Sequence, residues 1–270
     1  MIKAIFFDID GTLYDFSGNM PASTRLALRR AREYGHKLII CSGRARYQIY
    51  PELFSLFDGC IGSTGAYIED GGEVLSEHFM SKNMLIKVMD VATCSGAKIA
   101  AMTKEHMILD VACRDYIVDE FDKMECSKEM LQRIMGAYEL TEDLSAHTDI
   151  QKILYYDSKW SFEQMAEALS DICDVTASSF VEKAQTDGEI TMKGINKSYG
   201  IRKYIDAHGI SIENTIAFGD GPNDVDMLQY ASVGIAMGNS IQEVKDVADY
   251  VTKDVSAGGI LHAMSQFKLI

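Results

Sequence analysis

The chain contains short apolar runs that each stop abruptly at a polar or glycine-containing loop. Runs of this kind are typical of parallel strands, which are buried on both faces. They are Ala4–Phe7, Leu38–Cys41, Thr215–Phe218 and Val233–Met237. Apolar residues at helical spacing lie between them, and we expect helices over Thr24–Tyr34, Ser198–His208 and Val225–Tyr230. Strand and helix alternate, which predicts an α/β fold: a doubly wound, Rossmann-like core with a parallel sheet.

The middle of the chain has a different pattern. Asp70-Gly71-Gly72 predicts a turn, and the segments that follow mix helical and strand-like periodicity. We expect helices near Lys82–Ser95 and Phe162–Ser170 and strands near Lys98–Met102 and Ile150–Tyr156. This mixture predicts an inserted α+β domain at residues 81–189, with the α/β core at residues 1–80 and 190–270.

Composition limits the class of protein. The chain has 270 residues, enough for two domains, and its six cysteines form no C-x-x-C pair, which fits a reducing cytoplasm. We expect no signal peptide and no membrane span. A formal net charge of −14 argues against nucleic acid as a partner, although it does not exclude an anionic substrate. One basic cluster lies on a predicted helix and indicates a solvated face: Arg25, Arg29, Arg30 and Arg32.

Two carboxylates stand one residue apart directly after the first apolar run. In extended chain, Asp8 and Asp10 point the same way, and like charges this close are costly unless a cation neutralises them. Mg²⁺ suits such a site, because it binds a few carboxylates and leaves positions for water and phosphate oxygens. One carboxylate can then attack phosphorus while the other handles the proton. The pattern therefore predicts phosphoryl-transfer chemistry.

Three further motifs follow predicted strands or begin helices. Ser42-Gly43-Arg44 offers a hydroxyl and an unobstructed backbone amide to a phosphoryl oxygen, although Ser-Gly alone is also an ordinary helix cap. Gly219-Asp220-Gly221-Pro222-Asn223-Asp224 supplies a second acidic cluster. Lys197 begins a helix and could hold aspartate and phosphate charges together. Lys193 is a less favoured competitor, because it falls in an expected return strand.

Taken in order, Asp8-x-Asp10-Gly-Thr, Ser42-Gly-Arg, Lys197 and Gly-Asp220-Gly-x-Asn223-Asp224 resemble the four motifs of the haloacid dehalogenase superfamily of phosphotransferases. The long stretch between Ser42 and Lys197 resembles the C2 cap, type IIB, of the Cof-like hydrolases. The closing segment at residues 234–252 is similar to that of the same group. Thr64-Gly65-Ala66 and Ala257-Gly258-Gly259 depart from the Asn-Gly-Ala and Glu-Asp-Gly that are common in these relatives.

The resemblance implies a Mg²⁺-dependent phosphatase. Asp8 is then the nucleophile and Asp10 the general acid and base. The implied metal ligands are the Asp8 carboxylate, the Asp10 carbonyl and Asp220, with Asp224 as a ligand through water or a support. The implied phosphate contacts are Ser42, Lys197, Asn223 and the backbone amides of Ile9 and Gly43. Arg44 is a candidate substrate contact, and the cap is expected to select the leaving group.

The substrate implied is a small phosphorylated metabolite, such as a sugar phosphate or phosphorylated cofactor. Two alternatives stay open at this point. A phosphomutase of the same superfamily shares the Asp8 and Asp10 chemistry, and a receiver-like signalling switch also carries a phosphorylated aspartate. The sequence leaves the individual metabolite and the oligomeric state undetermined.

Overall fold

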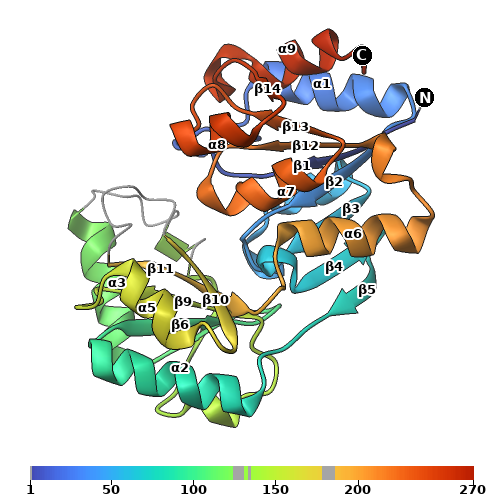
Figure 1. The fold of residues 1–270 in the computed structure, drawn as a ribbon. Coiled ribbons are helices and arrows are strands. Elements are labelled where there is room, and N and C mark those ends of the chain that lie inside the picture. Colours follow the sequence, from blue (N-terminus) through green and yellow to red (C-terminus); the bar gives the residue numbers. More distant parts are fainter. Residues whose placement is uncertain (1, 124–130, 133–134, 178–185) are drawn as a thin grey trace. The chain divides into compact units, whose positions relative to one another are not determined.

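The computed structural model describes residues 2–123, 131–132, 135–177 and 186–270 (Figure 1). The chain separates into two compact units. The first comprises Met1–Gly43, Tyr50–Glu77 and Asn196–Ile270, and the second comprises Arg44–Ile49 and His78–Ile195. The predicted inserted domain, residues 81–189, lies within the second unit, whereas the assignment of Arg44–Ile49 to this unit was not predicted.

The first unit is built on a sheet with the strand order β14-β13-β12-β1-β2-β3-β4-β5. Its strands are β1 (Ala4–Phe7), β2 (Lys37–Cys41), β3 (Gly59–Gly62), β4 (Tyr67–Asp70), β5 (Glu73–Glu77), β12 (Thr215–Gly219), β13 (Val233–Ala236) and β14 (Tyr250–Val251). The strands from β14 to β3 pair in parallel, and β4 and β5 add antiparallel strands at one edge. The expected turn at Gly71 and Gly72 connects β4 to β5, and both glycines have positive φ. The predicted doubly wound α/β fold is confirmed.

Helices cover both faces of this sheet (Figure 1). They are α1 (Ala22–Glu33), α6 (Lys197–His208), α7 (Val225–Tyr230), α8 (Gln242–Val247) and α9 (Gly259–Gln266). Helices α6 and α7 bury apolar side chains against alternate residues of the strands, and the rings of Phe6 and Tyr204 meet edge to face at 5.9 Å. Helix α1 packs with α9, and its four arginines are exposed, as the solvated-face interpretation predicted.

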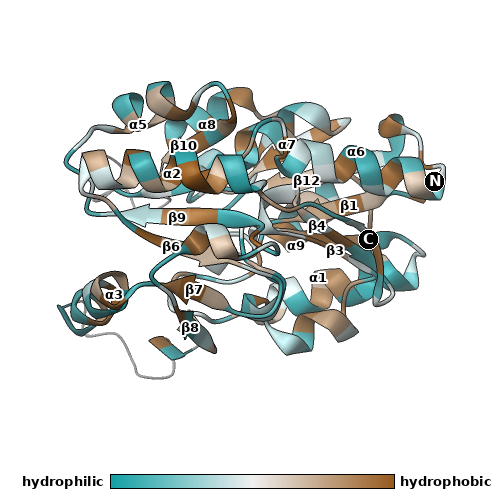
Figure 2. Ribbon diagram, turned by 90° about the horizontal axis from the view of Figure 1, so that it is seen from below, coloured by the Kyte–Doolittle hydropathy of each residue, from teal (hydrophilic) through white to brown (hydrophobic). Residues whose placement is uncertain are grey.

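The second unit contains a mostly antiparallel sheet with the order β10-β11-β9-β6-β7-β8. Its strands are β6 (Lys98–Met102), β7 (Met107–Leu109), β8 (Tyr138–Leu140), β9 (Lys152–Tyr156), β10 (Cys173–Ala177) and β11 (Gly188–Met192). Its helices include α2 (Lys82–Ser95), α3 (Val111–Lys123) and α5 (Phe162–Leu169). Figure 2 shows hydrophobic and hydrophilic residues alternating along α2, as an amphipathic helix on a sheet requires.

The segment Arg44–Ile49 follows Ser42 in the chain but packs in the second unit. The Tyr47 backbone N–H donates to the Lys104 carbonyl at 3.1 Å, and Ala45 is completely buried in the cluster that contains Met102. Of the six cysteines, Cys126 lies outside the described residues, and the other five are free. In the described part of the chain, no helix has both the length and the apolar character that crossing a bilayer requires.

Candidate active site

The predicted motifs meet at the carboxyl ends of three neighbouring parallel strands of the first unit. Asp8 follows β1, Ser42 follows β2 and Asp220 follows β12, and β1 pairs with both of the other strands. The Asp8 backbone N–H donates to the Phe218 carbonyl at 3.0 Å and so continues the β1–β12 ladder. Carboxyl ends of neighbouring strands are where α/β sheets place their ligands.

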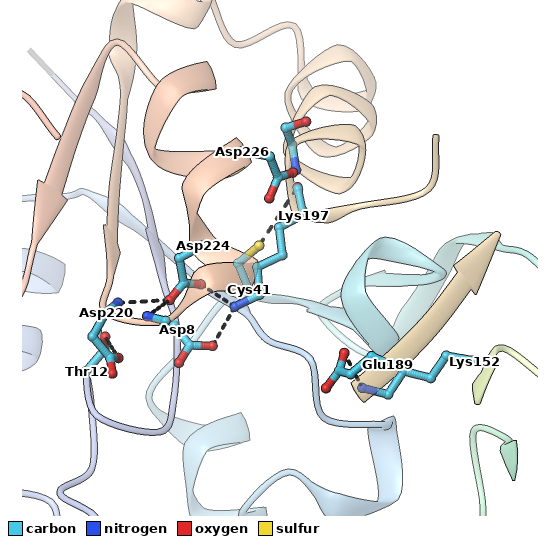
Figure 3. Close-up of polar contacts among 11 residues, drawn as sticks. Asp8, Thr12, Cys41, Lys152, Glu189, Lys197, Asp220, Asp224 and Asp226 are labelled. Carbon is cyan, nitrogen blue, oxygen red and sulfur yellow. Dashed lines mark hydrogen bonds and ion pairs between the residues drawn. The ribbon is translucent and has the colours of Figure 1, made fainter. Parts of the chain in front are cut away.

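A buried ion cluster joins Asp8, Lys197 and Asp224 (Figure 3). Lys197 is the first residue of α6, and its side chain is fully buried. Its Nζ lies 2.7 Å from Asp8 Oδ1 and also donates to Asp224 Oδ1. Asn196 caps α6 by accepting from the Tyr199 N–H at 2.8 Å, which fixes where the helix begins and therefore where Lys197 stands. Lys193, the competing candidate, is exposed and donates to the Ser170 carbonyl instead.

Asp224 has both carboxylate oxygens occupied. Its Oδ1 accepts from Lys197, and its Oδ2 accepts from the backbone N–H groups of Asp220 and Gly221 at 2.8 and 2.9 Å. The carboxylate therefore ties the Asp220 loop to α6. This arrangement favours Asp224 as a support for the loop over a direct metal ligand.

Asp220 is held from the opposite side by the loop that follows β1. The Thr12 hydroxyl donates to Asp220 Oδ1 at 2.7 Å. Gly11 has φ +81°, and a Cβ there would lie 2.0 Å from Asp220 Oδ2. Only glycine combines this backbone conformation with so close an approach. The glycine of the first motif is thus required by Asp220 as well as by the turn.

Burial shapes the charges of the cluster. Desolvation raises the pKa of Asp8 to about 7, with Lys197 opposing the rise and Asp224 adding to it. Desolvation likewise raises the pKa of Asp220 to about 8, aided by the charges of Asp8 and Asp224. Burial opposes the charge of Lys197, but Asp224 and Asp8 outweigh it and raise the pKa of the lysine well above its ordinary value. The lysine therefore stays charged, and the carboxylates remain in excess.

The carboxylates of Asp8, Asp220 and Asp224 gather at one place, where Asp8 and Asp220 can bind a cation and Asp224 adds negative charge. Each offers an oxygen, and these oxygens lie within 4.8 Å of one another. Three carboxylates against one ammonium leave uncompensated negative charge, and oxygen donors are what a hard divalent cation prefers. The donor set therefore fits a divalent metal. Within the described residues, the carboxylate cluster does not include Asp10, whose predicted ligand atom is its backbone carbonyl.

Asp10 lies in a tight loop directly after Asp8. The Ile9 carbonyl accepts from the N–H groups of Leu13 and Tyr14, both at 2.9 Å, and the Gly11 N–H donates to the Tyr14 carbonyl at 2.8 Å. Asp10 itself is half-buried. A backbone closed on itself in this way limits where the Asp10 side chain can reach.

The remaining predicted site residues are Ser42, Gly43, Asn223 and Arg44. Ser42 is buried, and its backbone donates to the Ile61 carbonyl at 2.8 Å and accepts from the Thr64 N–H at 3.1 Å. Gly43 is the last residue of the segment Met1–Gly43 in the first unit. Asn223 is half-buried in the short turn Pro222–Asp224. Arg44 belongs to the second unit, where its guanidinium donates to the Gln48 carbonyl at 3.0 Å. Its contact with substrate stays a prediction.

Sequence reasoning missed residues that support the cluster. Thr12 holds Asp220, and Asp226 Oδ2 accepts from the Ser198 N–H at 2.6 Å, at the start of α6 beside Lys197. The Cys41 sulfur lies 3.9 Å from the Lys197 carbonyl, and burial raises the pKa of its thiol well above the ordinary value. The one available signal was position, because Thr12 is the last residue of the first motif and Asp226 follows the last motif by two residues.

Comparison with known proteins agrees with this geometry. The family model described as haloacid dehalogenase-like hydrolase matches residues 5–264. The chain is 28% identical to YkrA of Bacillus subtilis strain 168, over 99% of this chain and 98% of that one. It is 27% identical to a phosphoglycolate phosphatase of Methanobrevibacter smithii, over 99% of each.

A solved structure of a subclass IIB sugar phosphatase of the same superfamily superimposes with a TM-score of 0.84 at 29% identity. The match covers 99% of this chain and all of that one. Phosphatases of this superfamily use a divalent metal, and the carboxylate cluster supplies a donor set for one. The motifs, the sheet topology and these matches together show that the chain belongs to the haloacid dehalogenase-like hydrolases and is a phosphatase.

Proposed function

We propose that this protein is a Mg²⁺-dependent phosphatase that hydrolyses phosphate monoesters of small metabolites through an aspartyl-phosphate on Asp8. The observation that carries the proposal is the buried cluster in which Lys197 bridges Asp8 and Asp224 beside Asp220. Such a cluster holds a carboxylate nucleophile in one orientation and leaves a deficit of positive charge at the same place. A phosphoryl substrate and its metal need both features.

Asp8 is the nucleophile. In the first step a carboxylate oxygen of Asp8 attacks phosphorus, a new oxygen–phosphorus bond forms, and the bond from phosphorus to the ester oxygen breaks. The nucleophile must be ionised, and its pKa of about 7 in the metal-free protein makes positive charge necessary at neutral pH. Lys197 supplies part of that charge at 2.7 Å. The covalent step divides one difficult displacement into two easier ones.

Asp10 is the general acid and base. It gives its proton to the departing ester oxygen in the first step and removes a proton from the attacking water in the second. Water then bonds to phosphorus, the bond to Asp8 breaks, and inorganic phosphate leaves with the Asp8 carboxylate restored. The short loop between Ile9 and Tyr14 keeps Asp10 next to the nucleophile.

Mg²⁺ fits the donor set of the site. Asp8, Asp220 and the Asp10 carbonyl would hold it, and Asp224 would keep the Asp220 loop in place. When bound, the metal neutralises charge on the phosphoryl oxygens and on the carboxylates. Ser42, Lys197 and Asn223, with the backbone amides of Ile9 and Gly43, would contact the phosphoryl group. Arg44 would reach the rest of the substrate.

The leaving group would be selected by the second unit, which acts as the cap. A cap that closes over the ester excludes water and contacts the part of the substrate beyond the phosphate. The similarity to a sugar phosphatase favours phosphorylated sugars as the first class to test.

A phosphomutase would retain its substrate and return the phosphate, whereas a switch would keep a long-lived phosphoaspartate.

The test is release of inorganic phosphate from a panel of hexose, pentose and glycerol phosphates and flavin mononucleotide. Wild type and Asp8→Asn are compared, each with Mg²⁺ and with chelator. Release that needs Mg²⁺ and disappears in Asp8→Asn supports the proposal. Isomerised sugar phosphate without free phosphate would favour the mutase. A stable phosphoprotein without turnover would favour the switch.

A further inference from the structure

One side chain from the C-terminal part of the first unit reaches the loop that carries Asp10. Asn239 lies in the turn after β13, and its Nδ2 donates to the Gly11 carbonyl at 2.8 Å. Its Oδ1 accepts from the Val255 backbone N–H at 2.9 Å. A backbone carbonyl can only accept and a backbone N–H can only donate, so these two partners fix the orientation of the amide.

A contact with the Gly11 carbonyl acts on the backbone directly beside Asp10. It belongs to the residue that directly follows Asp10, and Gly11 also donates its own N–H to the Tyr14 carbonyl. Thr12, the next residue, is attached to Asp220 through its hydroxyl. The backbone around Asp10 is therefore held from three sides. Two of these restraints come from the C-terminal segment Asn196–Ile270, and Asn239 supplies the one that acts directly on the backbone next to Asp10.

We propose that Asn239 is a positioning residue for the general acid Asp10. Asn239 touches the backbone next to Asp10 and connects it to Val255, so it would act on the reaction only through the placement of the Asp10 carboxyl. The inference rests on the proposed function, because it assigns the general acid role to Asp10. A misplaced general acid slows departure of a poor leaving group while leaving phosphate binding and nucleophilic attack intact.

The experiment uses this difference between leaving groups. Asn239→Asp keeps an oxygen for the Val255 N–H but places a carboxylate oxygen, in place of a donor, against the Gly11 carbonyl. We measure kcat and KM for p-nitrophenyl phosphate, whose leaving group departs with little help from an acid, and for the alkyl monoester hydrolysed fastest in the panel. We expect kcat/KM, which reports on the first step alone, to fall about ten- to a hundredfold on the alkyl ester and less than about threefold on the aryl ester. Loss of the base in the second step, which both esters share, would lower kcat on both.

Two reference variants make the result interpretable. Asp10→Asn calibrates the leaving-group dependence that loss of the acid produces. Asn214→Asp makes the same chemical change elsewhere in the first unit, where Asn214 Oδ1 accepts from Lys3 Nζ, and should leave both rates unchanged. Thermal unfolding of each variant shows whether it is folded, and Asn239→Ala replaces Asn239→Asp if the latter is not.

The outcomes separate the inference from the function beneath it. A preferential loss on the alkyl ester in both Asp10→Asn and Asn239→Asp supports the positioning role. A folded Asn239 variant could instead lose the same factor of kcat/KM on both esters, while Asp10→Asn loses more on the alkyl ester. That result would overturn the positioning role and indicate that Asn239 only stabilises the fold. If Asp10→Asn lowers kcat/KM equally on the two esters, the proposed general-acid role of Asp10 is wrong, and the positioning role of Asn239 is wrong with it.

Discussion

Each unit contains a largely buried group of charges, and the two groups differ in how their charges balance (Figure 3). In the second unit Lys152 Nζ lies 3.0 Å from Glu189 Oε2, an ammonium in contact with a carboxylate. In the first unit the ammonium of Lys197 is set against the carboxylates of Asp8, Asp220 and Asp224. An ammonium and a carboxylate in contact neutralise one another, whereas an excess of buried carboxylates takes up protons or a cation. An excess of carboxylates over ammonium groups, more than burial, therefore distinguishes the candidate reactive site from a structural ion pair.

Removing the lysine of the unbalanced cluster should have the largest effect. Lys197→Met leaves Asp8 and Asp224 buried without their shared cation, and such a loss destabilises a protein by about 3–5 kcal/mol. We expect this decrease in the free energy of unfolding, measured by urea denaturation in chelator above the Asp220 pKa of about 8, together with loss of phosphatase activity. Wild-type stability in the variant would mean that the lysine does not neutralise the cluster.

The metal-free cluster should also make stability depend on pH. The carboxyl pKa values of Asp8 and Asp220 rise from the ordinary value of 3.8 to about 7 and about 8 in the folded state. Between about pH 4 and about pH 8 the folded protein binds more protons than the unfolded chain, so its free energy of unfolding falls as the pH rises through this range. Each pKa unit corresponds to about 1.4 kcal/mol, so the rise at Asp8 alone corresponds to a decrease of about 4 kcal/mol.

Mg²⁺ provides the control for this pH effect. A cation that binds the ionised carboxylates competes with protons, so it should stabilise the protein more at pH 8 than at pH 5 and flatten the profile. The measurement is urea unfolding across this range with Mg²⁺ and with chelator. Stability that rises with pH in chelator, or an equal Mg²⁺ effect at both pH values, would contradict the charge excess.

The Lys152–Glu189 ion pair of the second unit should respond differently. Lys152→Met removes the ammonium 3.0 Å from Glu189, whose side chain is 19% exposed, so we expect a loss of about 1–2 kcal/mol. Replacing both partners, as Lys152→Met with Glu189→Leu, should restore stability to within about 1 kcal/mol of wild type, because apolar side chains then take the place of the ion pair. Urea unfolding of both variants measures this. A double variant less stable than the single one would show that the pair does more than balance charge.

The sequence predicted the core of the site because its positions follow from local pattern. Asp8, Ser42 and Asp220 each come directly after an apolar strand, and parallel strands bring their carboxyl ends together. Lys197 begins a helix whose periodicity was visible, and it does reach Asp8. To predict these positions, it was enough to know where the strands end and where the helix begins.

The missed contacts depend on side chains that join segments distant in the chain. Thr12 with Asp220 and Asn239 with Gly11 are pairs of this kind, and no local periodicity indicates either. The assignment of Arg44–Ile49 to the second unit was missed for the same reason, because it follows from where Ala45 and Tyr47 pack. Substrate selection, which we assign to the cap, likewise depends on tertiary positions that spacing does not encode.

Backbone strain offers a last, smaller comparison between the units. Thr64 in the first unit has φ 54° and ψ 37°, whereas the second unit uses Asp157 at a similar φ of 53°. Aspartate tolerates this left-handed conformation, but a β-branched residue does so only with strain.

Thr64→Asn should therefore raise the free energy of unfolding by about 1 kcal/mol, because asparagine adopts the left-handed conformation at lower cost. The Thr64 backbone N–H would still donate to the Ser42 carbonyl, so we expect activity to be retained. Urea unfolding measures the gain. Thr24→Asn, at another buried threonine, within α1, is the control and should lose stability, since no strain is relieved there. If both variants are destabilised, the left-handed turn beside Ser42 is held by contacts of the threonine side chain that outweigh its backbone strain.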